Sequence, residues 1–188
     1  MNIVSLLGSP HAWSRSAWLL ERASRRLATD GHEVHTLALR DLPADALLRA
    51  ESGRSALQRA LQQVARADVV LIATPIAQSA YTGLLKAFLD LLPPNGLRGK
   101  TVLPLATGAS AGHLLALDYA LKPVLHALGA SHIVEAVFAV DEQMVAHVTR
   151  GYVAEDLLVR RLDRALQSVL DAQPIASQLP DAAYPLAA

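Results

Sequence analysis

Three hydroxyl side chains and an arginine crowd into the loop that follows the first apolar run, residues 2–7. These residues are Ser9, Ser14, Arg15 and Ser16. Gly8 lets the chain turn, and a helix is predicted over 15–29. A helix N-terminus offers free N–H groups and the positive end of the dipole to an anion. The loop therefore predicts a phosphate site, although Ser14 could equally be the N-cap of an ordinary polar loop.

Two common nucleotide motifs do not fit the sequence. A dinucleotide fingerprint needs G-x-G-x-x-G, and only Gly8 is present in this loop. The "GKT" at 99–101 resembles the end of a P-loop, but the required first glycine would fall at position 94, which is proline. Lys100 also opens a predicted strand rather than a helix. Neither a dinucleotide fingerprint nor a P-loop is therefore expected.

Two further loops, 74–83 and 106–112, are nearly uncharged and rich in small residues. A flat heteroaromatic ring needs such walls, with backbone groups to read its edge. Two tight turns would have the same composition. Together with the phosphate loop, however, they outline a ligand with one phosphate and one planar ring system, and FMN fits that description.

The segment Gly108–Gly112 reads G-x-S-x-G and offers a different chemistry. It lies between a predicted strand and a predicted helix, as a nucleophile elbow does, with Ser110 as the nucleophile. Asp118 or Asp141 and His147 are possible triad partners. Only one further strand follows, however, whereas a hydrolase sheet needs more. The seven histidines show no metal-ligand spacing, and no metal site is predicted.

Apolar runs alternate with amphipathic patterns along the chain. Strands are predicted at 2–7, 33–39, 68–74, 100–107 and 131–140, and helices at 15–29, 55–67, 83–93, 111–128 and 154–172. This alternation predicts an α/β fold, a doubly wound five-stranded parallel sheet of order 2-1-3-4-5. Ligands bind such sheets at the carboxyl ends of the strands, where the three loops would meet. Pro104 suggests an edge, a bulge or a strand end at its position.

Composition narrows the class of protein. The chain has 188 residues, with 17 basic and 17 acidic side chains and no cysteine. This balance removes the electrostatic argument for a nucleic-acid or anionic-membrane partner. No apolar run is long enough for a membrane span or a signal peptide, so a cytoplasmic protein is expected. We expect one domain over 1–173 and a loose C-terminal tail over 174–188.

Several stretches resemble the NAD(P)H-dependent FMN reductases of flavodoxin-like fold, in particular the alkanesulfonate-type subgroup. They are "GSP…SRS", "IATPIAQSAYTGLLKAFLDLLP" and "GKTVLPLATGASAGHLLALDYALKPVL". The resemblance extends from the first strand to about residue 140. It implies a flavin reductase that uses NADPH or NADH and supplies reduced FMN to a partner monooxygenase acting on organosulfur compounds.

The resemblance also implies roles for individual residues. The phosphate of FMN would be held by Ser9, Ser14, Arg15 and Ser16. The isoalloxazine would be lined by Pro75, Ile76, Ala77, Gln78, Thr107, Gly108 and Ala109. Tyr119 falls where the subgroup carries an inserted tyrosine, which forms a π-bulge at the interface of a homodimer or homotetramer. It is a candidate for tuning flavin transfer.

Three positions depart from the family pattern. The family usually has arginine at position 11, tyrosine at 77 and glycine at 109, where this chain has His11, Ala77 and Ala109. These changes could lower flavin affinity or alter substrate choice. An enzyme that retains FMN and reduces a quinone, an azo dye or a metal ion therefore stays an alternative, as do the Ser110 hydrolase and a flavin-binding electron carrier.

Overall fold

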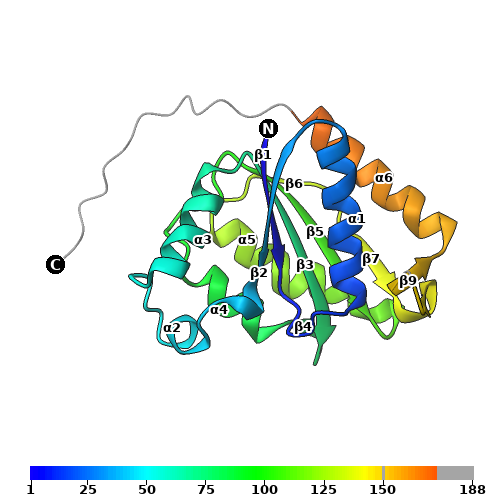
Figure 1. The fold of residues 1–188 in the computed structure, drawn as a ribbon, viewed down its shortest axis with the longest axis horizontal. Helices are drawn as coiled ribbons and strands as arrows, with labels where there is room; N and C mark the ends of the chain where they lie inside the picture. The colour runs from blue at the N-terminus through cyan, green and yellow to red at the C-terminus, as the bar shows by residue number, and fades with distance from the viewer. Residues whose placement is uncertain (150, 173–188) are drawn as a thin grey trace.

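A parallel β-sheet runs through the middle of the computed structural model, which describes residues 1–149 and 151–172. Its strands are β1 (Asn2–Leu7), β2 (Glu33–Ala38), β3 (Val69–Ala77), β5 (Thr101–Gly108), β6 (His132–Ile133) and β7 (Val137–Val140). They are ordered β2-β1-β3-β5-β6, with β7 also paired to β5 (Figure 1). The predicted order 2-1-3-4-5 is confirmed, with β6 and β7 sharing the fifth place.

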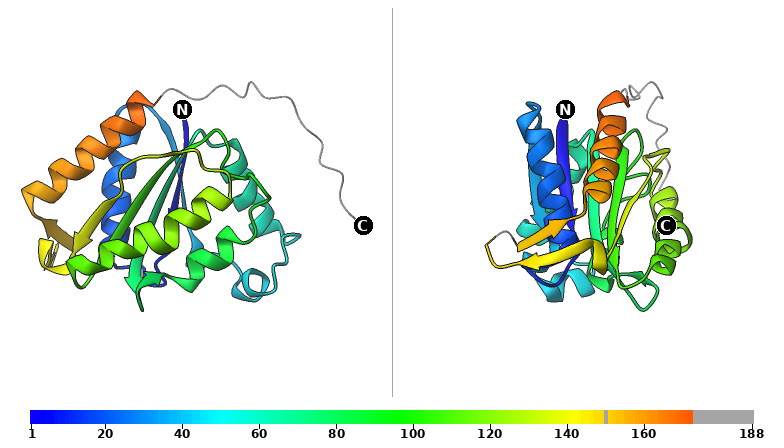
Figure 2. Two further views of the ribbon diagram at one scale, coloured as in Figure 1. Left: turned by 180° about the vertical axis from the view of Figure 1, so that it is seen from behind. Right: turned by 90° about the vertical axis from the view of Figure 1, so that its right-hand side faces the viewer.

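Helices cover both faces of the sheet (Figure 2). On one face lie α1 (Arg15–Thr29) and α6 (Asp156–Asp171), and on the other α3 (Ser55–Arg66), α4 (Gly83–Leu89) and α5 (Lys122–Ala127). Successive strand residues point to opposite faces. Ile3 and Leu7 therefore join the core under α1 and α6, whereas Val4 and Leu6 join the other core.

The fifth strand is interrupted between β6 and β7, and Pro104 explains where. Pro104 lies inside β5, which pairs with β3 from Thr101 to Thr107 and with β6 and β7 on its other side, so Pro104 is neither on an edge strand nor at a strand end. Val102 accepts a hydrogen bond from Val134 on the β6 side, and residues two apart point the same way. The N–H that Pro104 lacks would face the gap at 134–136, so no ladder bond is lost.

A hairpin that the sequence did not predict follows the sheet. It consists of β8 (Met144–His147) and β9 (Gly151–Ala154), and lies beside the start of α1 (Figure 1). The predicted helix over 154–172 therefore begins two residues later, at Asp156. A short helix, α2 (Ala44–Leu48), was also not predicted.

The predicted helix over 111–128 contains three kinds of helical turn. A 3₁₀ segment at Ala111–Leu114 is followed by a π-helix at Leu117–Leu121 and then by α5. Tyr119 lies in the π-helix, where the resemblance placed it. Another predicted helix on this face, 83–93, ends earlier, at Leu89.

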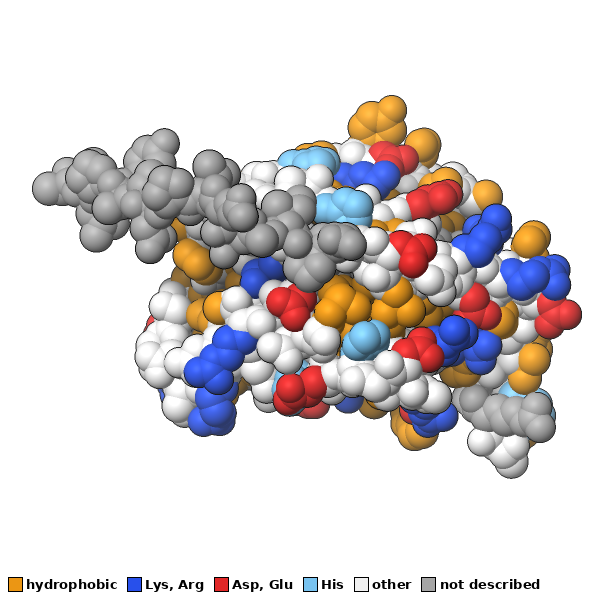
Figure 3. Space-filling view, turned by 90° about the horizontal axis from the view of Figure 1, so that it is seen from above, with side chains coloured by type: hydrophobic (Ala, Val, Ile, Leu, Met, Phe, Trp, Pro, Cys, Tyr) orange, Lys and Arg blue, Asp and Glu red, His pale blue; other side chains and the backbone are white. Residues whose placement is uncertain are grey.

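Acidic and basic side chains intermingle on the face at the amino ends of the strands, where the structure describes it (Figure 3). Among the described residues, no helix is both long and apolar enough to span a bilayer. The predicted tail, 174–188, lies outside the described residues.

Candidate flavin site

The first loop is fastened to the loop after β3. The Gly8 N–H donates to the Ala73 carbonyl at 2.8 Å, which extends the β1–β3 ladder by one bond. The Thr82 hydroxyl, at the N-cap of α4, donates to the Gly8 carbonyl at 2.6 Å. A Cβ on Gly8 would lie 2.9 Å from the Leu85 Cβ, so this close approach requires glycine.

Serines organise the start of α1. Ser14 is the N-cap, and its hydroxyl accepts from the Ala17 N–H at 3.1 Å and lies 3.2 Å from the Ser16 hydroxyl. Ser9 is buried, and its hydroxyl bonds to both the N–H and the carbonyl of His11 at 3.1 Å. Ser16 is buried as well. The N-cap interpretation of Ser14 is confirmed, and it does not compete with anion binding, because the cap takes up only the Ala17 N–H and leaves the earlier first-turn N–H groups without intrahelical partners.

Arg15, the first residue of α1, reaches across to residues 141–152. Its Nε donates to the Met144 carbonyl at 3.3 Å, and its Nη1 lies 3.5 Å from the Asp141 carboxylate. The guanidinium carbon lies 5.3 Å from the centre of the Tyr152 ring. The positive charge is thus held at the N-terminal end of α1 by residues that are more than 120 positions away.

A two-residue turn ends β3 and begins β4 (Ala80–Tyr81). Its residues, Gln78 and Ser79, have φ of 50° and 62°, the left-handed values that such hairpin turns need and that Asn-Gly usually supplies. Of the predicted ring contacts here, Ala77 and Gln78 are exposed and Pro75 is half-buried, whereas the Ile76 side chain packs into the core.

The third loop begins at the end of β5, next to the loop that follows β3. Thr107 pairs with Pro75, and Gly108 pairs with Val140. A Cβ on Gly108 would lie 3.0 Å from the His113 Nδ1 and 3.1 Å from the Phe138 ring. Glycine therefore lets the His113 ring close over the end of the strand, while Ala109 beyond it is exposed.

The three loops therefore meet at the carboxyl edge of β1, β3 and β5, as the sequence predicted. One side offers hydroxyls, first-turn N–H groups and a fixed arginine, which suit a phosphate. The other offers exposed small or uncharged residues from two adjacent strand ends, which suit a flat ring. The residues fit FMN by this chemistry.

Neutral and paired side chains surround the second loop. Burial raises the pKa of the Tyr81 phenol, so the phenol stays neutral throughout the physiological range. Its neighbour Lys86 is hydrogen-bonded to Asp90, which raises the pKa of the ammonium group. Neither side chain is therefore poised to exchange a proton near neutral pH.

The hydrolase alternative is not assembled in the described part of the chain. Ser110 has extended backbone angles, φ −147° and ψ 157°, rather than the strained turn of a nucleophile elbow. Asp118 pairs with Lys122, Asp141 with Arg15, and the His147 ring bonds to Thr149. No group of three or more His, Asp or Glu side chains within 1–149 and 151–172 could hold a metal ion.

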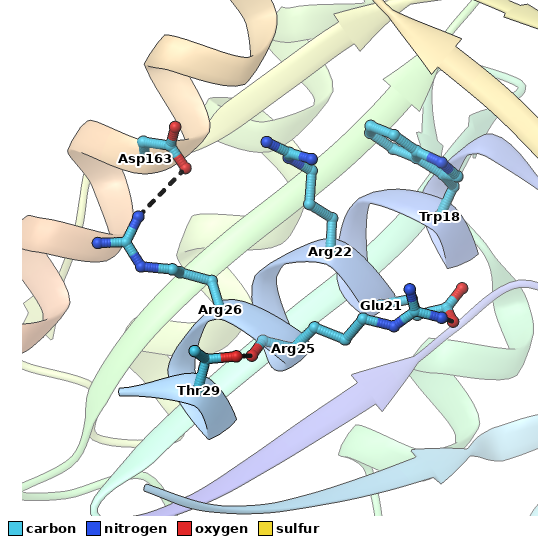
Figure 4. A pocket seen from close by; sticks show the side chains of 7 residues that line it. All are labelled: Trp18, Glu21, Arg22, Arg25, Arg26, Thr29 and Asp163. Atoms are coloured by element: carbon cyan, nitrogen blue, oxygen red, sulfur yellow. Dashed lines mark hydrogen bonds and ion pairs between the residues drawn. The ribbon is translucent and has the colours of Figure 1, made fainter. Parts of the chain in front are cut away.

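A groove of about 330 Å³ lies elsewhere, between α1 and α6 (Figure 4). Three arginines line it, together with Trp18, Glu21, Thr29 and Asp163. Arg25 pairs with Glu21, Arg26 pairs with Asp30 and Asp163, and Arg22 lies over the Trp18 ring. None of the residues predicted to bind flavin lines this groove, so the groove is separate from the candidate flavin site.

Fold and site together define a flavodoxin-like oxidoreductase. Residues 1–144 match the family of NADPH-dependent FMN reductases. FMN reductase (NADPH) of Escherichia coli is 45% identical over 168 residues, covering 89% of this chain and 87% of that protein. FMN reductase (NADPH) of Pseudomonas putida is 44% identical over 176 residues, 94% of this chain and 88% of that protein.

A solved structure agrees with these relatives. The apo form of the NADH:FMN oxidoreductase EMOB is 40% identical in sequence and superposes with a TM-score of 0.83. The match covers 93% of this chain and 91% of the EMOB chain. The chain belongs to the NADPH-dependent FMN reductase family, whose members use FMN and NAD(P)H. The predicted family, enzyme class and cofactors are confirmed.

Sequence reasoning missed two groups of residues at the site. The hairpin residues Met144 and Tyr152 contact Arg15, but four-residue strands give too short an alternation to be recognised. His113 gave no signal of its own, because only its packing against Gly108 shows that it borders the third loop.

Proposed function

We propose that the chain takes free FMN as a substrate, reduces it with NADPH or NADH, and releases reduced FMN to a separate flavin-dependent monooxygenase. The observation that carries this proposal is the exposure of Ala77, Gln78 and Ala109 at the edge where the ring would lie. A flavin on such an open edge can dissociate between turnovers. The resemblance to the alkanesulfonate-type subgroup favours a monooxygenase that acts on organosulfonates.

The proposed phosphate site is the loop from Gly8 to Ser16. Arg15 would supply charge, and the first-turn N–H groups and the Ser14 hydroxyl would supply hydrogen bonds. Ser9 and Ser16 are buried and hydrogen-bonded within the loop, so in this arrangement they support its shape.

The proposed ring site is formed by Pro75, Ala77 and Gln78 on one side and by Thr107, Gly108 and Ala109 on the other. Backbone N–H and carbonyl groups at these strand ends would form hydrogen bonds with the polar edge of the isoalloxazine. Ile76 would act from the core side, fixing the position of the strand end.

Bound FMN would supply the redox chemistry by accepting a hydride from the nicotinamide at its N5 atom. The residues of the chain would hold the two rings in contact, within about 3–3.5 Å, so that proximity lowers the barrier. Hydride transfer itself needs no side-chain acid or base, so we assign no catalytic residue.

The proposed assembly is a homodimer or homotetramer formed through the π-helix. Tyr119 is 80% exposed, and Leu114 and Leu115 beside it are also exposed. Apolar side chains grouped in this way commonly mark an interface. We propose a cytoplasmic location, where reduced pyridine nucleotide is available.

A coupled assay tests the transfer of flavin. The chain, FMN and NADPH would be mixed with an FMN-dependent alkanesulfonate monooxygenase and an alkanesulfonate in air. We expect sulfite release that needs all components, and a chain that loses its flavin on gel filtration. Rapid NADPH oxidation with flavin retained on the column and no sulfite would instead indicate an enzyme that keeps its FMN.

A further inference from the structure

One segment supplies the hydrogen bond, the ion pair and the aromatic contact of the Arg15 side chain. The Met144 carbonyl, the Asp141 carboxylate and the Tyr152 ring all belong to residues 141–152. Figure 1 shows β9 beside the first turns of α1, where Arg15 lies. The hairpin thus touches the phosphate loop at its only arginine.

The three contacts leave part of the guanidinium free. Nε is taken up by the Met144 carbonyl, Nη1 faces Asp141, and one face of the group lies over Tyr152. Nη2 donates to none of the described residues. A phosphate could therefore be met by this nitrogen while the side chain keeps its place.

The platform under Arg15 is itself anchored. Met144 is fully buried in the core between the sheet, α1 and α6, and Tyr152 packs against the same core. The antiparallel ladder pairs Met144 with Ala154 and Ala146 with Tyr152. Tyr152 thus sits on a strand that cannot move away without breaking both packing and hydrogen bonds.

We propose that the β8–β9 hairpin is the outer wall of the phosphate site and that Tyr152 is a positioning residue, which acts on FMN through Arg15. This proposal rests on the proposed function, since it needs the phosphate of FMN beside Arg15. An arginine that is already ordered loses less side-chain freedom on binding, and ordering one such side chain costs about two- to tenfold in affinity.

Tyr152 can orient Arg15 without opposing the phosphate, because an aromatic face attracts a guanidinium but carries no net charge. Asp141 differs, since its carboxylate neutralises part of the charge that the phosphate would meet. Substitutions of Tyr152 therefore change the orientation of Arg15 without changing the net charge beside the phosphate.

The experiment is a double-mutant cycle read with two ligands, FMN and riboflavin, which differ by the phosphate. Binding would be followed by flavin fluorescence for wild type, Arg15→Ala, Tyr152→Leu and the double variant, with Tyr152→Phe as the variant that keeps the ring. We expect Arg15→Ala to weaken FMN binding about ten- to a hundredfold. Tyr152→Leu should weaken it about two- to tenfold, and Tyr152→Phe should match wild type.

Riboflavin should bind all five proteins alike, and Tyr152→Leu should cause no further loss of FMN affinity once Arg15 is alanine. Equal losses with and without Arg15, or no loss from Tyr152→Leu alone, would overturn the role of Tyr152 while leaving the phosphate site intact. An unchanged ratio of FMN to riboflavin affinity in Arg15→Ala would refute the phosphate site itself. Should Tyr152→Leu lose riboflavin too, Tyr152→Val, which suits a strand, takes its place in the cycle.

Discussion

Gly8 shows how one small residue sets the geometry of the site. The first loop can lie against α4 only because no side chain separates the Gly8 backbone from Leu85. The same contact brings the Gly8 carbonyl to the Thr82 hydroxyl. Gly108 has the equivalent part in the third loop, where the His113 ring occupies the space of a side chain.

Gly8→Ala should therefore destabilise the protein by about 1–3 kcal/mol, because the added methyl group must push Leu85 or the loop aside. Urea denaturation of both proteins measures this loss. Gly53→Ala is the matched control, since nothing lies within 4 Å of a Cβ at that glycine. Equal stabilities of the two variants would show that the loop is not held as tightly as the distances indicate.

Single residues also show what the sequence could and could not reveal. The Ser14 N-cap and the phosphate-loop chemistry follow from residue types next to a predicted helix, and the helix begins where predicted. The neighbours of Arg15 could not be predicted from the sequence, because Asp141, Met144 and Tyr152 come close to it only in the folded chain. Ile76 was expected at the ring, but its alternation along β3 turns its side chain into the core.

Helix α4 depends on Thr82, which links it to the site. The Thr82 hydroxyl accepts from the Leu85 N–H at 3.3 Å and donates to the Gly8 carbonyl. Thr82→Ala removes both bonds and should lower the free energy of unfolding by about 1–2 kcal/mol. Thermal or urea unfolding would measure the change.

Thr82→Ser is the control, because it keeps the hydroxyl and should stay within a few tenths of a kcal/mol of wild type, about the margin expected between good caps. A serine variant as unstable as the alanine variant would show that packing of the methyl group, rather than the cap, explains the effect.

The Lys100 side chain caps the C-terminal end of α3. Its ammonium group donates to the carbonyls of Ala65 and Ala67 at 2.8 and 2.7 Å. Burial lowers the pKa of Lys100 below its ordinary value, with Asp68 opposing the shift. As pH rises through the lowered pKa, the folded chain loses this proton first, so the unfolded chain binds more protons and the free energy of unfolding rises.

Lys100→Met removes this pH dependence together with the two hydrogen bonds. We expect the stability difference between wild type and the variant to be larger at about pH 10 than at about pH 7, as the proton linkage requires. Urea unfolding at the two values measures it. A difference that shrinks with pH would mean that the charged form of Lys100 is favoured in the fold.

Elements of ordinary length were predictable from periodicity, and irregular ones were not. The five strand positions and most helices follow from apolar spacing. The break at 134–136 did not, since "SHIVEAVFAV" reads as one strand and only the register against β5 reveals two. The β8–β9 hairpin was not predictable for a different reason. Its valines, Val145, Val148 and Val153, are exposed, so apolar residues do not mark a buried face of either strand.

An apolar patch lies on the surface of the chain at and just before the π-helix. It consists of Leu114, Leu115 and Tyr119. If this patch forms the proposed interface, the wild-type chain should run as a dimer or tetramer in gel filtration with light scattering. Tyr119→Ala should shift the mass towards smaller species, and Tyr119→Phe should not. A wild-type monomer, or equal masses for all three proteins, would refute the interface.

The central proposal is that free FMN binds at the carboxyl edge of the sheet and is reduced there. The most direct measurement is the rate of NADPH oxidation by the purified chain as the concentration of added FMN increases. We expect almost no NADPH oxidation without FMN and a saturable rise in rate as FMN is added. Oxidation that is independent of added FMN, by a chain that is yellow as purified, would contradict the use of FMN as a substrate.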